Sequence, residues 1–356
     1  MIKHLRKELH NNPEPSMNEI NTKRILMDFI QTHTKSLELV DMDSWFYAIK
    51  KGRNPETPIA FRADYDAVTC ADGSCRHLCG HDGHSAVLAG FALWLDTIPV
   101  ERYVYLIFQP GEENGKGAAI CSSLIENKNI GEIYGFHNIP GYEKGEVLLL
   151  THTFACASTG LEIKLIGKQS HAAYPENGKN PATAIAEIIR YMNEMIGEPH
   201  KGIVLGTVIG IEVGSESYGV SAGEGSLRLT LRAEYQDEYD DFVRKIEEKA
   251  EELASDIGLA CEISRIEEFP ATINDQSCVD KVYNAAHKLN QKTIYPAIPF
   301  RWSEDFGYYL QHTKGAFFGV GCGKYHADLH TMEYEFEDDI IEPVIDLYKE
   351  ILYKKE

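Results

Sequence analysis

The sequence predicts an α/β fold: a largely parallel, mixed-sheet domain with a ferredoxin-like α+β domain inserted into it. Three observations support this prediction. Apolar runs alternate with helical patterns over the first 140 or so residues, as in parallel sheets covered by helices. The pattern changes to β-α-β-β-α-β between residues 159 and 267, which is typical of ferredoxin-like domains. The length of 356 residues suits one large or two medium domains.

The larger domain begins with a helical pattern over residues 3–32 that two prolines interrupt. Short apolar runs predict strands at 58–63, 103–108 and 132–137, with a helix over 82–95. Polar side chains follow these runs, and ligands of such sheets bind beyond the carboxyl ends of the strands. The reactive candidates at this edge are Asp64, Asp66, Glu112, Glu113 and His137.

The inserted domain is expected to span residues 159–267, so that the larger domain is discontinuous, comprising 1–158 and 268–356. Its predicted strands are 161–166, 203–213, 226–234 and 260–266, and its helices are 181–195 and 237–257. Asn180 can cap the first helix and Gly258 ends the second. The second helix places apolar side chains on one face: Phe242, Ile246, Ala250, Leu253 and Ile257.

Composition excludes several classes of protein. The formal net charge of −20 and a pI near 5.1 argue against nucleic acid or an anionic membrane as a main partner. We find no apolar run long enough to span a membrane and no apolar core of a secretory signal. Eight cysteines are too sparse for a disulfide scaffold, so we expect reduced thiols and a cytoplasmic location.

The segment His77–His84 contains one thiol, three imidazoles and one carboxylate within eight residues. Thiolate and neutral imidazole are ligands that zinc prefers. A histidine-rich turn with a structural cysteine is the alternative. Cys79 and His81, two residues apart on a turn, are the pair that could point toward one metal.

Glu112 and Glu113 follow a buried strand directly. Adjacent residues at a strand end diverge, so one carboxylate can bind metal while its neighbour faces a bound water. This division of roles suits metal-assisted hydrolysis, in which the free carboxylate takes a proton from the water and later delivers it to the leaving amine. A solvated acidic turn is the alternative.

Other histidines are ambiguous when taken singly. For His137 and His330, a hydrogen-bonded core histidine is the commoner explanation. His171 belongs to the inserted domain, so its expected role is a hydrogen bond to a substrate oxygen or a developing oxyanion.

Together these motifs resemble the metal-dependent aminoacylase/carboxypeptidase superfamily of amidohydrolases. The chain is most similar to the branch with hippurate hydrolases, auxin-conjugate amidohydrolases and N-acetyl-diaminopimelate deacetylases. The resemblance covers nearly the whole chain, and its motifs are Leu9–Glu14, Phe61–Ala67, Cys79–His84, Gln109–Glu113, Gly135–His137, Ser170–Pro175, Ser303–Phe306 and Leu329–His330.

The resemblance implies a role for each matching residue. Glu112 matches the family's general base, and His171 matches a histidine that reaches the active site across the dimer in related enzymes. Two divalent ions per subunit are implied, with zinc, manganese, cobalt or nickel all open. A homodimer formed through the inserted domain is also implied. The implied metal ligands are Cys79, His81, Glu113, His137 and His330, with the thiolate placed to touch both metals.

Three features leave alternatives open. Arg232 is a candidate for binding a substrate carboxylate, but the chain has Gly219 where the family usually has an asparagine that helps in this. Arg232 could instead be a charge on a strand surface. Asp64 and Asp66 could orient a metal-ligand imidazole or form a strand-end turn. Asp305 could support the metal site, but a role in favouring a helix N-terminus is the simpler interpretation.

The sequence therefore predicts a metal-dependent amidohydrolase for an N-acyl amino acid or similar small amide, acting through metal-activated water. The alternatives are a dipeptidase or carboxypeptidase on the same scaffold and a non-catalytic metal-binding protein. The partner expected is a small-molecule substrate, with the inserted domain acting as lid and dimerisation surface.

Overall fold

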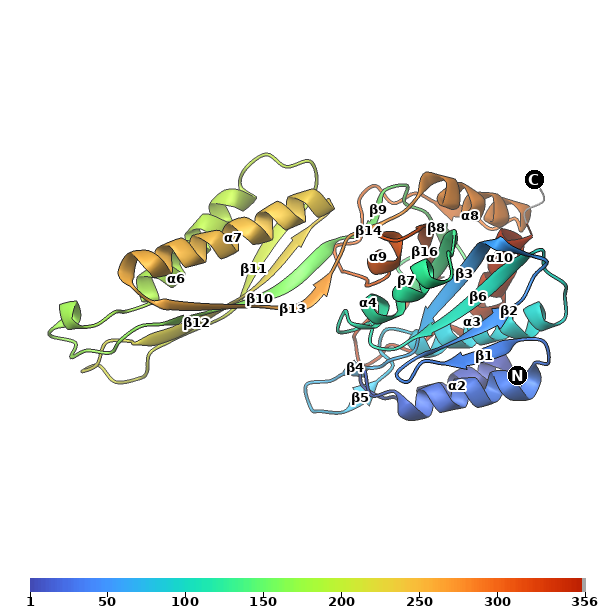
Figure 1. Cartoon of the computed structure of the whole chain (residues 1–356), viewed down its shortest axis with the longest axis horizontal. Helices are drawn as coiled ribbons and strands as arrows, with labels where there is room; N and C mark the ends of the chain where they lie inside the picture. Colours follow the sequence, from blue (N-terminus) through green and yellow to red (C-terminus); the bar gives the residue numbers. More distant parts are fainter. Residues whose placement is uncertain (354–356) are drawn as a thin grey trace. The chain divides into compact units, whose positions relative to one another are not determined.

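The computed structural model describes residues 1–353, and the chain forms two compact units (Figure 1). The first unit contains Met1–Phe154, Thr272–Pro299 and the chain from Glu304 onward. The second contains Ala155–Ala271 together with the short stretch Phe300–Ser303. Each unit has an apolar core of its own.

An eight-stranded sheet forms the centre of the first unit, in the spatial order β1-β2-β6-β3-β7-β16-β8-β15. The four central strands β6, β3, β7 and β16 pair in parallel, whereas β1, β2 and β8 pair antiparallel with neighbours. The strands are β1 (Glu38–Asp41), β2 (Phe46–Lys50), β3 (Asn54–Asp64), β6 (Arg102–Gln109), β7 (Glu132–Pro140), β8 (Val147–Leu148), β15 (Thr293–Ile294) and β16 (Lys314–Gly323). Two short pairs add β4 (Val68–Thr69) with β5 (Cys75–Arg76), and β9 (Thr153–Ala155) with β14 (Thr272–Ile273).

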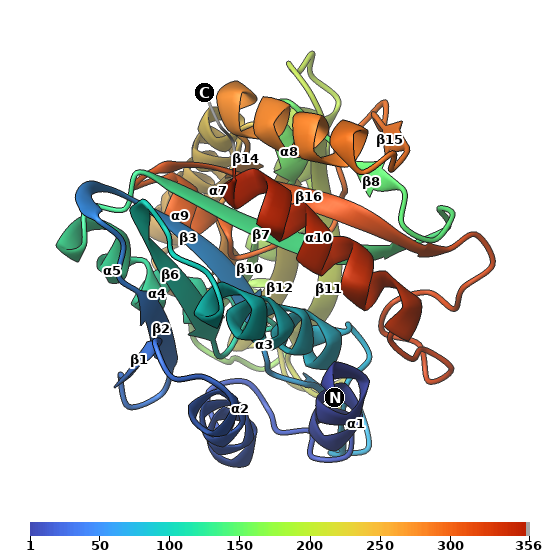
Figure 2. The same cartoon turned by 90° about the vertical axis from the view of Figure 1, so that its right-hand side faces the viewer.

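Helices α3, α8 and α10 cover one face of this sheet, as Figure 2 shows. The helix α3 is buried along almost its whole length and packs on α1, α2 and α10 as well as on β3. Its apolar side chains join those of the central strands in one core. The helices are α1 (Ile2–His10), α2 (Ile20–His33), α3 (His81–Asp96), α4 (Gly117–Cys121), α5 (Ser123–Asn127), α8 (Gln276–Lys288), α9 (Gly307–Leu310) and α10 (Ile341–Leu352), with a 3-10 turn at Asp338–Ile340.

The parallel pairing brings the functional loops to one edge. The strands β3 and β6 end together, with Asp64 opposite Gln109. His137 lies in β7 opposite Gly319 of β16. Because these strands are neighbours that point the same way, the loops beyond their carboxyl ends converge.

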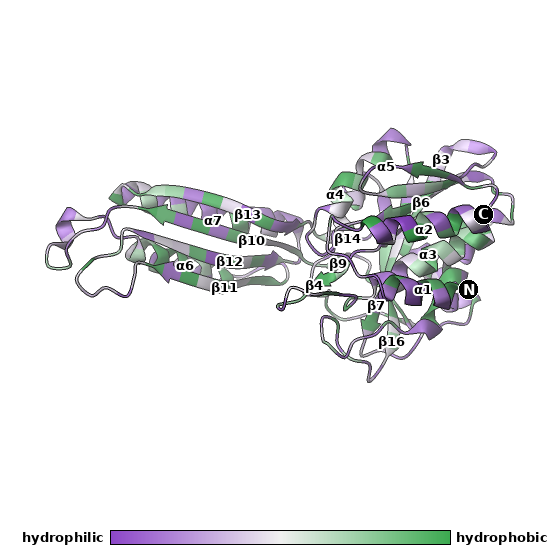
Figure 3. Ribbon diagram, turned by 90° about the horizontal axis from the view of Figure 1, so that it is seen from below, coloured by the Kyte–Doolittle hydropathy of each residue, from purple (hydrophilic) through white to green (hydrophobic). Residues whose placement is uncertain are grey.

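The second unit is a four-stranded antiparallel sheet, β11-β12-β10-β13, whose core is completed by two helices. Its element order is β-α-β-β-α-β, so the predicted fold class is confirmed. In Figure 3 the ribbon of α7 alternates between hydrophilic and hydrophobic residues, as expected for a helix with one buried face. The elements are β10 (Ala157–Ile166), a 3-10 turn (Pro175–Asn177), α6 (Ala182–Ile196), β11 (Val204–Val213), β12 (Glu224–Ala233), α7 (Gln236–Ile257) and β13 (Ala260–Phe269).

Two local predictions in this unit meet different outcomes. Asn180 Oδ1 accepts the N–H of Ala182 at 2.9 Å, and Gly258 ends α7 with φ of 70°. Gly258 agrees with the expected helix end, whereas α6 begins one residue later than predicted, with Pro181 rather than Asn180 at the N-cap. Of the apolar face predicted for α7, Phe242, Ile246 and Ala250 are buried, whereas Ile257, the last residue of the helix, is 43% exposed. Among the described residues, no helix has the length and apolarity needed to cross a membrane.

Candidate metal centre

Five side chains predicted as metal ligands gather at the carboxyl edge of the first unit's sheet. They form two groups of donor atoms, and within each group the atoms lie within 4.8 Å of one another. One group is Cys79, His81 and His137, and the other is Cys79, Glu113 and His330. Cys79 belongs to both groups, so a single thiolate could contact two ions.

The turn before α3 places Cys79 and His81. Gly80, between them, has φ of 101°, a conformation that glycine adopts without strain. A Cβ on Gly80 would lie 2.5 Å from Asn138 Oδ1 and 2.6 Å from Tyr334 Oη. Only glycine therefore allows this turn to approach Asn138 and Tyr334 while α3 starts at His81. Cys79 Sγ lies 3.4 Å from His137 Nε2, and both residues are buried.

His330 reaches the site from the loop after β16, about 250 residues from Cys79 in the chain. Its backbone has φ of 63°, which is uncommon for a residue with a side chain. Its N–H donates to the carbonyl of Leu78 at 2.8 Å, which fixes this strained residue beside the Cys79 turn. Its Nε2 then lies 3.5 Å from Glu113 Oε1.

The donor atoms are arranged as a cation site requires. Within residues 1–353, His81 Nε2 and Glu113 Oε1 are buried without a hydrogen-bond partner, although they lie 3.8 Å apart. Buried polar atoms are normally paired, so two unpaired acceptors that face each other indicate a site suited to a cation. Thiolate, imidazole and carboxylate are donors that fit a divalent transition metal.

The pKa values of two proposed ligands also indicate a site suited to cations. Burial acts to lower the pKa of His81, but Asp64 and Cys79 outweigh it and hold that pKa well above its ordinary range. Interactions with the side chains of Cys79 and Glu113 raise the pKa of His330 to about 10. Both shifts arise from an excess of negative charge, which divalent cations would offset.

Glu112 occupies a different position from Glu113. It is 6% exposed, and the backbone N–H of Asp305 donates to its Oε1 at 3.4 Å. Its carboxylate also groups with His81 and Glu113 within 4.8 Å. Burial, followed by the charges of Glu304 and Asp305, raises the pKa of Glu112 well above its ordinary range. A raised pKa increases the basicity of the ionised carboxylate, which is the form that acts as a general base.

Asp66 and Asp64 hydrogen-bond to different histidines. Asp66 Oδ1 lies 2.9 Å from His81 Nδ1, which leaves Nε2 of that ring for a metal. Asp64 Oδ1 instead lies 2.6 Å from Nδ1 of His84, and its Oδ2 accepts from Arg62. His84 is buried, and its Nε2 lies 2.6 Å from Asn138 Oδ1. Asn138 in turn donates to Tyr334.

Sequence reasoning missed the residue at the centre of this network. Arg62 is buried in β3 and contacts Asp64 at 2.8 Å, Asp305 at 2.6 Å and Glu304 at 3.0 Å. Burial raises the pKa of Glu304 to about 8 and that of Asp305 to about 6, against the opposing effect of Arg62. Asp305 accepts the N–H of Ala118 in the first turn of α4, but it also accepts from Arg62 and Gln109, so it does more than favour a helix start. The signal was Arg62 itself, the one charge inside the otherwise apolar run 58–63.

The remaining candidates, His171 and Arg232, lie in the second unit. His171 is exposed, and its Nδ1 accepts the N–H of Ala173 at 3.0 Å. Arg232 is half-buried in β12, and its Nη1 donates to Ser303 Oγ at 2.8 Å and to the carbonyl of Arg301 at 3.1 Å. Burial lowers the pKa of Arg232.

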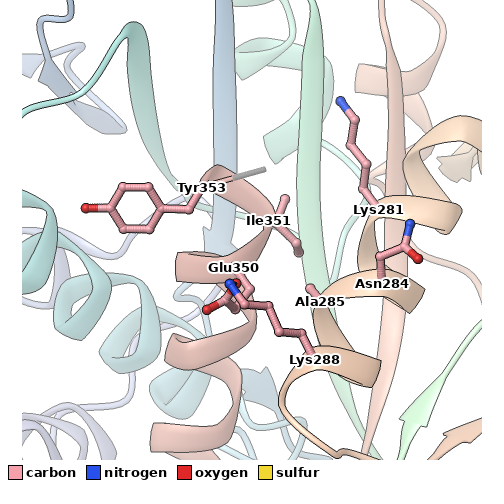
Figure 4. Close-up of a pocket in the computed structure, with 7 residues that line it drawn as sticks. All are labelled: Lys281, Asn284, Ala285, Lys288, Glu350, Ile351 and Tyr353. Carbon is pink, nitrogen blue, oxygen red and sulfur yellow. The ribbon is translucent and has the colours of Figure 1, made fainter. Parts of the chain in front are cut away.

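A cavity of the first unit lies apart from these groups, between α8 and the end of α10 (Figure 4). Its lysines already have acidic partners: Lys281 contacts Glu132, and Lys288 contacts Glu350. None of the candidate site residues lines it. The lining residues are Lys281, Asn284, Ala285, Lys288, Glu350, Ile351 and Tyr353.

Comparison with known proteins identifies a family and several relatives. Residues 60–354 match peptidase family M20/M25/M40. An N-acetyldiaminopimelate deacetylase of Leuconostoc mesenteroides subsp. mesenteroides is 26% identical over 371 residues, covering 99% of this chain and 96% of that protein. An N-acetyl-L-cysteine deacetylase of Bacillus subtilis is 27% identical over 352 residues, covering 95% of this chain and 84% of that protein.

Solved structures share the fold. The Bacillus subtilis YxeP protein, described as a dinuclear metal-binding peptidase of the M20 family, has a TM-score of 0.80 and 22% identity over 99% of this chain and 96% of that one. An aminobenzoyl-glutamate utilization protein from Klebsiella pneumoniae has a TM-score of 0.77 and 16% identity, over 99% of this chain and 94% of that one.

Proposed function

The chain belongs to peptidase family M20/M25/M40 and is a metal-dependent hydrolase, and we propose that it cleaves the amide bond of an N-acyl amino acid or a similar small amide. The single observation that carries the proposal is the pair of donor groups that share Cys79, with the carboxylate of Glu112 beside them. The two relatives named above are deacetylases of N-acetyl amino acids, which supports this substrate class.

Two divalent ions would be held by Cys79, His81, Glu113, His137 and His330. The unpaired buried atoms of His81 and Glu113 support this assignment. The donor set leaves zinc, manganese, cobalt and nickel open. Bound ions would supply an activated water near neutral pH and polarise the amide carbonyl.

Glu112 is proposed as the general base. Burial, together with the charges of Glu304 and Asp305, raises the pKa of Glu112 and so the basicity of its carboxylate. Its place beside His81 and Glu113 suits contact with the attacking water. Glu112 would take the proton of that water as the carbonyl is attacked and pass it to the leaving nitrogen. The carboxylate is then regenerated for the next cycle.

His171 is proposed to stabilise the oxyanion of the tetrahedral intermediate. Because its Nδ1 accepts a hydrogen bond from Ala173, the neutral ring carries its proton on Nε2. An exposed Nε2–H is a suitable donor to an oxyanion. Arg232 is proposed to bind a substrate carboxylate: its described contacts are neutral oxygens, so its charge remains available for an acidic group.

The second unit is proposed to act as lid and dimerisation domain, with the larger domain at 1–158 and 268–356 and the insertion at 159–267. Its edge strand β11 supports a role in dimerisation. Ile209 is 60% exposed and Ile211 is 51% exposed on that strand, where pairing with a second copy would cover them. All eight cysteines are free, which suits a reducing compartment, and we propose a cytoplasmic location.

The proposal is tested by metal analysis of the purified protein coupled to a hydrolysis panel. The panel contains acetyl- and benzoyl-amino acids together with dipeptides. We expect about two metal ions per chain and turnover of the acylated amino acids. Faster turnover of dipeptides would favour the peptidase alternative. Bound metal without hydrolysis of any member would refute an enzymatic role.

A further inference from the structure

Residues 14–19, which we call the strap, join two of the loops at the active edge of the first unit. The strap precedes α2, and its Glu14 carbonyl accepts the N–H of Ala67 at 2.9 Å. Ser16 Oγ donates to Asp66 Oδ2 at 2.7 Å. Glu19 Oε1 accepts the N–H of Gly111 at 2.7 Å. The strap therefore ties the turn after β3 to the turn after β6.

Glu19 is the most buried charged group of the strap, with 4% exposure. Its Oε1 also accepts the N–H of Met17 at 2.8 Å. Met17 has φ of 68°, an uncommon conformation for a residue with a side chain. This conformation places Met17 over Gly111, where a Cβ would lie 2.5 Å from the Met17 sulfur. One carboxylate thus fixes both Met17 and the glycine beneath it.

Gly111 is the residue before Glu112. It has φ of 56°, and its carbonyl accepts the N–H groups of Lys116 and Gly117, which closes the turn that follows. Its own N–H is directed at Glu19. Without that carboxylate, the buried N–H of Gly111 would lose its partner, which is unfavourable because buried N–H groups are almost always paired. The turn would be expected to relax instead, and Glu112 would move with it.

We infer that Glu19 is a positioning residue that holds the backbone of the general base Glu112 through Gly111. The inference rests on the proposed function and extends it to a residue outside the metal-ligand motifs. Glu19 does not contact the donor atoms of the two metal groups, so its loss should affect turnover more than metal content. A displacement of about 1 Å at a reacting group can cost on the order of 100-fold in rate.

The chemistry of Glu19 also defines a conservative substitution. Burial and the nearby charge of Asp66 raise the pKa of Glu19 to about 7. Both the ionised and the protonated carboxyl group can accept through Oε1, so glutamine can replace it in the two backbone hydrogen bonds. Alanine cannot.

The experiment compares Glu19→Ala and Glu19→Gln in the metal-loaded protein. Glu19→Ala is expected to lower kcat by about 10- to 100-fold with KM changed less than threefold and metal content unchanged. Glu19→Gln is expected to restore kcat to within about threefold of wild type. Glu14→Ala is the matched control from the same strap. The Glu14 carboxylate accepts from the N–H groups of Asn21 and Thr22 at the start of α2, so its loss should lower Tm and leave kcat nearly unchanged.

Hydrogen exchange over residues 109–117 gives a second measurement that does not depend on turnover. Faster exchange of this turn in Glu19→Ala, with slow exchange kept in Glu19→Gln, supports the inference. Unchanged hydrogen exchange in Glu19→Ala overturns the inference. An unchanged kcat in Glu19→Ala, a loss of metal that parallels the loss of kcat, or a low kcat in Glu19→Gln also overturns it. If metal-loaded wild type hydrolyses no amide of the panel, the proposed function fails, and the exchange result alone decides the role of Glu19.

Discussion

Asp66 Oδ1 lies 2.9 Å from His81 Nδ1, and Oδ2 of the same carboxylate accepts the backbone N–H of Glu113 at 3.0 Å. One buried carboxylate thus orients one proposed ligand by its ring and the other by its backbone. Such supporting contacts commonly account for 10- to 100-fold in metal affinity. They also explain why residues 47 positions apart in sequence, Asp66 and Glu113, act together.

Replacing Asp66 by asparagine is expected to weaken metal binding by about 10- to 100-fold, because an amide offers one acceptor oxygen where the two carboxylate oxygens now bind His81, Glu113 and Ser16. Competition with a coloured chelator measures the change. Asp72→Asn is the control, since that exposed carboxylate lies on the turn between β4 and β5 and accepts from Ser74. Equal affinities for the two variants would refute the orienting role of Asp66.

Cys79 is shared by the two donor groups, whereas His137 and His330 each belong to one. Cys79→Ser is therefore expected to weaken binding of both ions. His137→Ala and His330→Ala should each weaken binding of one. Metal-to-protein ratios across a titration distinguish these patterns. A Cys79→Ser protein that keeps both metals at wild-type affinity would contradict the sharing of this thiolate.

Glu112 and Glu113 provide a matched pair for the roles of base and ligand. Glu112→Gln is expected to keep its metal and to lose at least the roughly 10²–10⁴-fold in kcat that general acid–base groups supply. Glu113→Gln is expected to lose metal affinity first. Parallel kinetics and metal analysis of both variants provide the measurement. Turnover within tenfold of wild type in Glu112→Gln would exclude it as the base.

Glu132, at the start of β7, gives a pH-dependent prediction outside the site. Burial acts to raise its pKa, but hydrogen bonds from Lys281 and Tyr134 and the charge of Arg102 lower it to about 2. A carboxylate with a depressed folded-state pKa stabilises the fold above its unfolded pKa of about 4.5, and this contribution is lost as the pH falls toward 2. The side chains of Lys281 and Arg102 are about a quarter exposed, so solvent screening weakens their ion pairs with Glu132.

We therefore expect Glu132→Gln to lower the free energy of unfolding by about 2 kcal/mol at pH 7. The difference from wild type should shrink below pH 4.5. Urea unfolding of both proteins between pH 7 and pH 3 measures it. A difference that stays constant over this range would mean that the charge of Glu132 does not contribute.

Much of the fold follows from local patterns. The run Tyr103–Phe108 lies within β6, and Gly258 ends α7 as its position predicts. These features depend on residues close together in sequence, so a single chain reveals them. The exposure of Ile257 could not be predicted in this way, because packing decides which residues of an apolar face are buried, and local periodicity does not contain that information.

The candidate site divides in the same way. Cys79 and Glu112 stand in dense motifs, and their chemistry could be inferred from residue type and spacing. Glu19 could not, because its significance depends on Gly111, 92 residues away in sequence. Asp305 could not either, since its partners Arg62 and Gln109 lie 243 and 196 residues away. Contacts of this range are formed by the completed sheet.

The pairing of Arg62 with Glu304 and Asp305 has a consequence for synthesis of the chain. At about 5–20 residues per second, roughly 12–50 s separate the appearance of Arg62 from that of Asp305 on the ribosome. During that interval Asp64 is the one carboxylate of this cluster already made. The central strand β3 thus cannot bury its arginine with all its charges balanced before Glu304 and Asp305 are made. A nascent chain that stalls before Glu304 would therefore be a substrate for chaperones.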